Sequence, residues 1–191
     1  MQSEPKEISE FCLEQIEIQK LSSEHNTLDF DCYDGYEEDK DLNDFIKNDA
    51  LNERYEGWNQ TYVAIKKGTK DVVGFFSISN ESFEVRPEIK KEKNKPYQQI
   101  PATKIARLAV DNNHQNKGLG TFLVKFAIGF IVDQICKNSG CRYITVDAYP
   151  HRVDWYKNHF DFTENVIVET NSNRCINLIL DLKDFEKKLK K

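Results

Sequence analysis

The sequence predicts an α+β fold in which helices flank a central mixed sheet. Residues 103–149 read as a strand, a long helix and a second strand, and such a unit forms two parallel strands with a right-handed crossover. Residues 61–79 contain two apolar, β-rich runs separated by KKGTKD, which is typical of an antiparallel hairpin. Parallel and antiparallel pairs in one chain indicate a mixed sheet.

The length and composition favour one globular domain. The chain has 191 residues and shows no internal repeat or long linker, so we expect a single domain over 1–191, with a core at about 11–182 and a basic tail at 183–191. Hydrophobic residues make up 39% and charged residues 31%, a soluble balance. Because uninterrupted apolar runs fall short of the ~18 residues that a membrane span needs, we predict no membrane segment.

The N-terminus and the cysteines favour the cytoplasm. The start MQSEPKEISE lacks the basic and apolar regions of a secretory signal. The five cysteines are odd in number and scattered, which suits free thiols in a reducing compartment. Only Cys136 and Cys141 lie close together, without a matching pair elsewhere, so no metal site is predicted.

The charge is unevenly distributed along the chain. The net charge is −5, with 13 basic against 22 acidic residues in 1–100 and 14 against 10 in 101–191. The second half therefore suits an anionic ligand better than the first. The overall composition is not that of a typical nucleic-acid-binding domain, which is usually strongly basic.

The first half contains three further expected elements. A first strand lies within 11–21, where apolar residues alternate loosely. A helix is predicted over 41–56, since apolar residues recur there at near-helical spacing and acidic residues stand at its N-terminal end. Residues 86–96 mix charges with two prolines and lack periodicity, which predicts an exposed loop.

The second half begins with the strand at 103–110, whose apolar character predicts burial on both faces. The helix that starts near Gly118 is expected to be buried on most sides. Its main stripe comprises Leu119, Phe122, Leu123, Phe126, Ala127, Phe130 and Ile131, while Val124, Ile128 and Val132 lie off it. A buried strand at 141–149, a short helix at 151–160, strands at 165–170 and 175–182 and a C-terminal basic helix complete the fold.

Two glycines mark the start of the long helix. The first N–H groups of a helix have no intrahelical partner and attract anions. Gly118 and Gly120 lack the Cβ atoms that would hold a phosphate away from this backbone, and Lys117 adds a cation. The spacing fits neither the Walker P-loop nor the dinucleotide-binding pattern G-x-G-x-x-G.

The sequence QNKGLG at 115–120 does resemble the acetyl-CoA pyrophosphate loop of the GNAT superfamily of N-acetyltransferases, [QR]-x-x-G-x-[GA] between a strand and a helix. The order of elements over roughly 11–182, with RLAV before the loop and VDA and WY after it, is similar to that superfamily. The resemblance implies a GNAT-like acyl-CoA N-acyltransferase fold, acetyl-CoA as cosubstrate and direct transfer of acetyl to a primary amine.

The resemblance also implies site residues. Leu108, Ala109 and Val110 would bind the pantetheine through the strand backbone. The turn would hold the pyrophosphate with Gln115, Asn116, Lys117, Gly118, Leu119, Gly120 and Thr121. Tyr156 takes the place of the tyrosine that protonates the departing thiolate; its alternative role is that of a core aromatic beside Trp155.

The segment after Tyr156 departs from the family pattern. Asp161 stands where the family usually has glycine, and Asp tolerates the left-handed end of a helix better than most residues. The general base is left open: Asp147 suits either a catalytic or a structural role, the three histidines His114, His151 and His159 are further candidates, and a water relay needs no base.

The acceptor amine is also left open. FDCYD, LNDFI, IPATKIARLAVD and VDAY with WY resemble the GNAT branch that includes toxins acetylating aminoacyl-tRNA. The basic residues of 86–95 and of the tail favour such a substrate, whereas the acidic first half disfavours it. Small-molecule or peptide acetylation, or a catalytically silent domain that senses acyl-CoA or binds a partner, are the alternatives. The chain is expected to be a monomer or homodimer.

Overall fold

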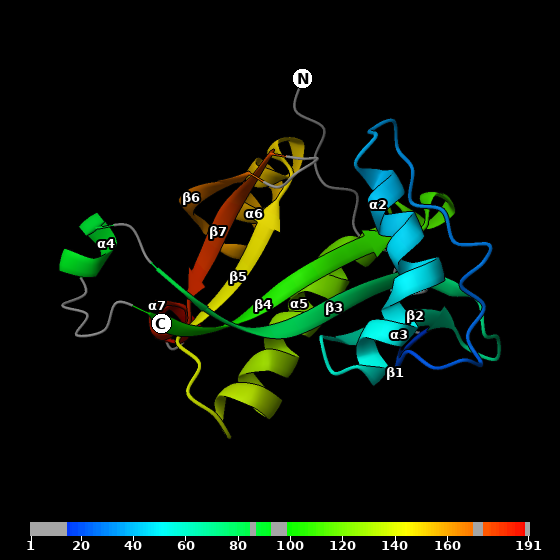
Figure 1. Cartoon of the computed structure of the whole chain (residues 1–191), viewed down its shortest axis with the longest axis horizontal. Helices are drawn as coiled ribbons and strands as arrows, with labels where there is room; N and C mark the ends of the chain where they lie inside the picture. The colour runs from blue at the N-terminus through cyan, green and yellow to red at the C-terminus, as the bar shows by residue number, and fades with distance from the viewer. Residues whose placement is uncertain (1–14, 85–86, 93–98, 170–173, 190–191) are drawn as a thin grey trace. The chain divides into compact units, whose positions relative to one another are not determined.

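The computed structural model describes residues 15–84, 87–92, 99–169 and 174–189. The chain forms two compact units, residues 1–77 with 107–126 and residues 78–106 with 127–191. Its strands follow the order β1-β2-β3-β4-β5-β7-β6 in a seven-stranded sheet (Figure 1). The predicted mixed sheet is confirmed, since parallel and antiparallel pairs both occur.

The first unit holds the beginning of the sheet. Strand β1 (Ile16–Lys20) pairs antiparallel with β2 (Gln60–Lys66), and the neighbouring strands are β3 (Val72–Phe83) and β4 (Ile100–Val110), each of which continues into the second unit. The predicted strand at 11–21 is confirmed over 16–20, whereas residues 11–14 lie outside the described residues.

The predicted helix at 41–56 is confirmed. It consists of α2 (Asp39–Asp44), a π-helical turn η1 (Phe45–Asp49) and α3 (Ala50–Tyr55), which packs on β2. Its apolar face joins the core of the first unit, which contains Leu21, Phe30, Cys32, Phe45, Ile46, Ala50, Val63, Ile65, Val72, Phe75 and Ala109. The acidic residues Asp39 and Asp41 lie in its first turn, where their negative charges interact favourably with the positive end of the helix dipole.

The second unit contains the remaining strands. Strand β4 pairs parallel with β5 (Tyr143–Ala148), as predicted for a strand–helix–strand unit. Antiparallel pairing then joins β5 to β7 (Arg174–Asp181) and β7 to β6 (Thr163–Glu169), so that β5 lies between β4 and β7 in Figure 1. Among the described residues, five short helices belong to this unit: α4 (Pro87–Glu92), η3 (Ile131–Cys136), η4 (Pro150–Arg152), α6 (Val153–Phe160) and α7 (Leu182–Leu189).

The predicted loop at 86–96 is wrong in part, because residues 87–92 form helix α4 (Pro87–Glu92). Proline suits the first position of a helix, where its missing N–H is not needed, and Glu88 in the first turn complements the dipole. Pro87 therefore marks a helix start here. Residues 86 and 93–96 lie outside the described residues.

The long helix α5 (Leu119–Phe130) begins where predicted, and its buried face matches the predicted stripe only in part. The buried side chains are Leu119, Leu123, Val124, Ala127, Ile128 and, in η3, Ile131, whereas Phe126 is 36% exposed. Val124 and Ile128 were expected to lie off the stripe, and Phe126 on it. Because apolar residues surround this helix, its periodicity does not select one face. The strand β4 is likewise not buried on both faces throughout, since Leu108 is half-buried whereas Ala109 and Val110 are buried.

By length and composition, one helical stretch of the described residues is sufficient to cross a membrane. Leu119–Cys136 spans 18 residues with a mean hydropathy of 1.7, and 33% of it is buried. Uninterrupted apolar runs did not reveal it, because Lys125 and Asp133 fall within it. A core helix of a soluble protein meets the same criterion, so this stretch is a weak indication, and the absence of a membrane segment stays a prediction.

Gly74 on β3 is required by close packing within the first unit. A Cβ atom there would lie 2.9 Å from Cδ1 of Leu123 and 3.3 Å from the carbonyl oxygen of Ala109. Since Leu123 is fully buried, Gly74→Ala is expected to lower the free energy of unfolding by about 1–3 kcal/mol, the usual cost of overpacking. Urea denaturation measures the change.

Gly129 in α5 supplies the control for this prediction. A Cβ there meets no atom within 4 Å, so Gly129→Ala should stabilise the protein by several tenths of a kcal/mol through helix propensity. Equal stability of Gly74→Ala and wild type would show that β3 and α5 move apart at little cost.

Candidate active site

The turn between β4 and α5 has the backbone that its glycines predict. After β4 ends at Val110, a 3₁₀ turn η2 (Asn112–His114) leads to the segment 115–118. Asn116 has φ 56° and Gly118 has φ 83°, both in the left-handed region. Gly118 is needed for this conformation, since other residues except Asn and Asp rarely adopt it. Gly120 lies in the first turn of α5 and has no positive φ.

The N-terminus of α5 provides donors for an anion. The first α-helical hydrogen bond runs from the Phe122 N–H to the Gly118 carbonyl, 3.0 Å. The N–H groups of Leu119, Gly120 and Thr121 precede it and have no intrahelical partner. Together with the helix dipole and the two missing Cβ atoms, they fit a pyrophosphate. The predicted loop residues therefore form one continuous segment of the first unit, called the cradle below, and its binding of a pyrophosphate stays a prediction.

The strand residues that lead into the cradle are also in this unit. Ala109 is 6% and Val110 9% exposed, and Leu108 is half-buried. Their backbones form the end of β4 immediately before the turn. Lys117 is exposed, and its Nζ donates to the Asn113 carbonyl at 2.7 Å, so its charge is held at the outer side of the turn.

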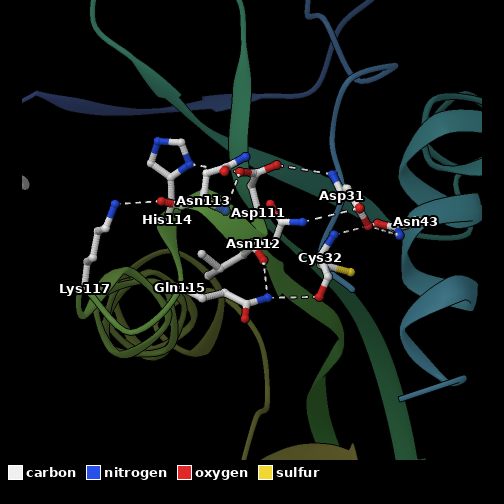
Figure 2. Close-up of polar contacts among 10 residues, drawn as sticks. Asp31, Cys32, Asn43, Asp111, Asn112, Asn113, His114, Gln115 and Lys117 are labelled. Atoms are coloured by element: carbon white, nitrogen blue, oxygen red, sulfur yellow. Dashed lines mark hydrogen bonds and ion pairs between the residues drawn. The ribbon is translucent and has the colours of Figure 1, made fainter. Parts of the chain in front are cut away.

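A polar network that the sequence did not reveal surrounds this turn (Figure 2). The buried carboxylate of Asp111 accepts from the N–H of Asn113, 3.1 Å, and from that of Asp31, 3.2 Å. Its contact with Asn113 has a sequence signal, because an Asp directly after a strand often caps the following turn. The contact with Asp31 has none, since 80 residues separate the two.

Tyr156 lies in the second unit, on α6, and is packed among aromatic rings. It is 6% exposed, with ring centroids 4.9 Å from Trp155 and 5.6 Å from Phe162. Burial raises the pKa of its phenol above the usual value, so the hydroxyl stays protonated at neutral pH. A protonated phenol can act as a general acid. The aromatic packing is equally compatible with a purely structural role for Tyr156 in the core.

The end of α6 has the predicted left-handed cap. Asp161 adopts φ 60° and ψ 21°, the conformation that glycine usually supplies at this position. The replacement of glycine by aspartate therefore does not disturb the end of the helix that carries Tyr156.

Asp147 has both carboxylate oxygens engaged within the second unit. Its Oδ2 lies 2.5 Å from Nζ of Lys104, and its Oδ1 accepts from Asn177 at 2.8 Å. Lys104 also contacts Glu81 at 3.1 Å. Burial opposes the charge of Lys104, but the hydrogen bond and charge of Asp147, with those of Glu81, outweigh it and raise the pKa of Lys104. These contacts favour the structural role for Asp147.

The candidate histidines have separate surroundings. Nδ1 of His114 lies 3.0 Å from Oδ1 of Asp111, and Nδ1 of His159 lies 2.9 Å from the Trp155 carbonyl. His151 stacks on Tyr149, with ring centroids 5.9 Å apart. His114 belongs to the first unit and the other two to the second. These contacts do not single out one of the three histidines as the base.

Comparison with known proteins assigns the chain to a family. The model of the acetyltransferase (GNAT) family matches residues 23–162. A tRNA-acetylating toxin of Mycobacterium tuberculosis (strain ATCC 25618 / H37Rv) is 29% identical over 143 residues, which cover 75% of this chain and 81% of the toxin.

Solved structures share the fold. AtaT complexed with acetyl-methionyl-tRNAfMet superposes with a TM-score of 0.74 at 22% identity, covering 91% of this chain and 99% of AtaT. A mutant AtaT toxin bound to the C-terminus of the antitoxin AtaR and to acetyl-CoA gives a TM-score of 0.70 at 20% identity, covering 93% and 99%. With the family model matching most of the chain, the protein belongs to the GNAT family of acetyltransferases and is an acetyl-CoA-dependent N-acetyltransferase.

Proposed function

We propose that this enzyme transfers the acetyl group of acetyl-CoA to the α-amine of an aminoacyl-tRNA. The observation that carries acetyl transfer is the left-handed turn at Gly118 before the free N–H groups of α5, which fits the pyrophosphate of the cosubstrate. The tRNA substrate is supported by the similarity to a tRNA-acetylating toxin and to AtaT in complex with an acetylated aminoacyl-tRNA.

The proposed reaction is a direct attack of the amine on the thioester carbonyl. The new C–N bond forms as the C–S bond breaks, the thiolate takes a proton from Tyr156, and the ammonium loses its proton to water. An α-amine has a pKa of about 8, against about 10.4 for lysine, so a good part of it is neutral near pH 7.5. Such an acceptor needs no dedicated base, which agrees with the engaged carboxylate of Asp147.

The basic residues proposed to meet the tRNA are only partly described. Lys91 on α4 and Lys183 on α7 are exposed. Arg86, Lys93 and Lys95 lie outside the described residues, as do the last two lysines of the tail. The proposed contacts of these basic residues with tRNA phosphates are therefore tested by the salt dependence of tRNA binding.

The same relatives suggest which protein partner the enzyme has. We infer a protein partner of the antitoxin type, because the AtaT toxin is bound by the C-terminus of AtaR. We also expect the whole chain to work as one GNAT-like domain, as a monomer or homodimer. The cysteines that the structure describes, Cys32, Cys136, Cys141 and Cys175, form no disulfide bond, which supports the proposed cytoplasmic location.

The test offers the enzyme three acceptors with radiolabelled acetyl-CoA: a charged tRNA, the corresponding free amino acid and a peptide. We expect acetylation of the charged tRNA above both others. Binding of uncharged tRNA should weaken roughly 10- to 100-fold between about 50 and 200 mM salt, as for a few phosphate contacts. Turnover of a free amine together with salt-independent or undetectable tRNA binding would remove the tRNA proposal. Absence of any turnover despite CoA binding would favour the catalytically silent alternative.

A further inference from the structure

We propose that Asp31, Asp111 and Gln115 form a brace that holds the acetyl-CoA turn in its binding conformation before the cosubstrate arrives. In this role Gln115 is a positioning residue, and its side chain does not contact the phosphates. The inference rests on the proposed binding of acetyl-CoA by the turn. The inference gives a supporting role to the segment 30–34, which is far from the turn in sequence but hydrogen-bonded to it (Figure 2).

The side chain of Gln115 has no donor left for a phosphate. Its Nε2 donates to the carbonyl of Cys32 at 2.9 Å and to that of Val110 at 3.0 Å. An amide NH₂ has two hydrogens, and both are used. The reversed orientation would place Oε1 against two carbonyl oxygens, so the assignment follows from the chemistry. The remaining oxygen is an acceptor and would repel a phosphate.

Asp111 connects the turn to the same remote segment. It is 6% exposed. Its Oδ1 accepts from the Asn113 N–H and lies 3.0 Å from Nδ1 of His114, while Oδ2 accepts from the Asp31 N–H. A buried carboxylate with three such partners is well satisfied. It fixes the 3₁₀ turn and the segment 30–34 relative to each other.

Asp31 returns a hydrogen bond to the turn and extends the brace to α2. Its carbonyl accepts from the Asn112 N–H at 2.7 Å. Its Oδ1 accepts from the Tyr33 N–H at 3.0 Å and from Asn43 of α2 at 2.8 Å. These hydrogen bonds lower the pKa of Asp31, so the carboxylate is charged at neutral pH. Asn43 in turn accepts from the Cys32 N–H at 2.9 Å.

The turn needs such support because its conformation is unfavourable by itself. Asn116 has φ 56°, which a residue with a Cβ adopts at an energetic cost. Without the brace the turn would populate other conformations, and the apparent affinity for a ligand falls with the fraction that is competent to bind. Loss of the brace should therefore raise the dissociation constant of CoA and leave the chemical step unchanged.

The experiment uses Gln115→Met in the full chain, which keeps the length of the side chain and removes its donors. We expect the Kd of CoA and the KM of acetyl-CoA to rise about 10-fold, with kcat at saturating acetyl-CoA retained. In the ligand-free protein, NMR should show faster hydrogen exchange at the amides of Asp31 and Asn112. The exposed Gln134→Met is the matched control and should change none of these quantities.

Asp31→Ala provides a second variant outside the turn. It keeps the backbone hydrogen bonds of residue 31 to the turn and removes the carboxylate that holds the segment 30–34 through the Tyr33 N–H and Asn43. It should raise the Kd of CoA, and its effect should be less than additive with that of Gln115→Met, because both variants loosen one network. This variant also tests the brace if Gln115→Met does not fold.

The outcomes separate the brace from the proposed function. Unchanged CoA binding in both variants overturns the brace. Weaker CoA binding by Gln115→Met with unchanged exchange in the ligand-free protein also overturns it, because Gln115 would then be a ligand. If wild type binds no CoA, the proposed function fails, while the exchange of the two amides still reports whether Gln115 holds the segment.

Discussion

Gly120→Glu is expected to raise the dissociation constant of CoA at least about 100-fold. Gly120 lies in the first turn of α5 without a positive φ, so a side chain fits its backbone without strain. A carboxylate there would face the proposed pyrophosphate, and two unit charges about 4 Å apart repel by about 4 kcal/mol near a protein surface. Isothermal titration calorimetry with CoA measures the effect.

Gly120→Gln is the matched control, since it has the same shape without the charge. Its Kd should lie between those of wild type and Gly120→Glu, and the difference between the two variants should shrink at high salt. Gly118→Glu should be at least as damaging, because φ 83° adds backbone strain to the charge. Unchanged CoA affinity in both glutamate variants would show that the turn does not bind the pyrophosphate.

Tyr156→Phe is expected to lower kcat by about 10²–10⁴, the usual contribution of a positioned acid. Because free thiols have pKa values of about 8.5, thiolate is a tolerable leaving group, and the loss should fall at the low end of this range. CoA affinity should stay nearly constant, because the ring that packs on Trp155 and Phe162 is retained. Single-turnover kinetics provides the measurement.

The pH profile gives an internal check on this assignment. Since burial raises the pKa of Tyr156 above its usual value, the phenol keeps its proton at least up to about pH 10. Tyr156 should therefore cause no loss of kcat between about pH 7 and 10. If Tyr156→Phe retains full kcat where chemistry limits the rate, Tyr156 is a packing residue of the aromatic cluster on α6.

Local sequence patterns were sufficient for the elements whose structure depends on nearby residues. The parallel pair β4 and β5 followed from a strand–helix–strand order, because chirality leaves one favourable crossover. Asp161 was recognised as the end of α6 because few residue types tolerate a left-handed backbone, whereas Gly118 was singled out for its missing Cβ atom and its positive φ is a finding of the structure. The start of α5 close to Gly118 followed from the same kind of local pattern, whereas the binding of a pyrophosphate there stays a prediction.

Patterns that several structures satisfy equally were decided only by tertiary contacts. The helix α5 is apolar on most sides, and packing alone turned Val124 and Ile128 inward and left Phe126 partly exposed. The prolines near 87 and 96 were compatible with a loop or with a helix start, and the first of them begins α4.

The sequence by itself predicted most of the order of the strands and helices along the chain, with α4 as an exception, and the family to which the chain belongs, because these depend on short-range geometry and on a motif. Only the tertiary structure decided the role of Gln115, which donates to Cys32, 83 residues away, and the contact of Asp111 with Asp31. It likewise engaged Asp147 with Lys104 and Asn177. Hydrogen bonds between residues so far apart in sequence produce no periodic sequence pattern. The partners come together only when the apolar residues of the core pack and the chain folds.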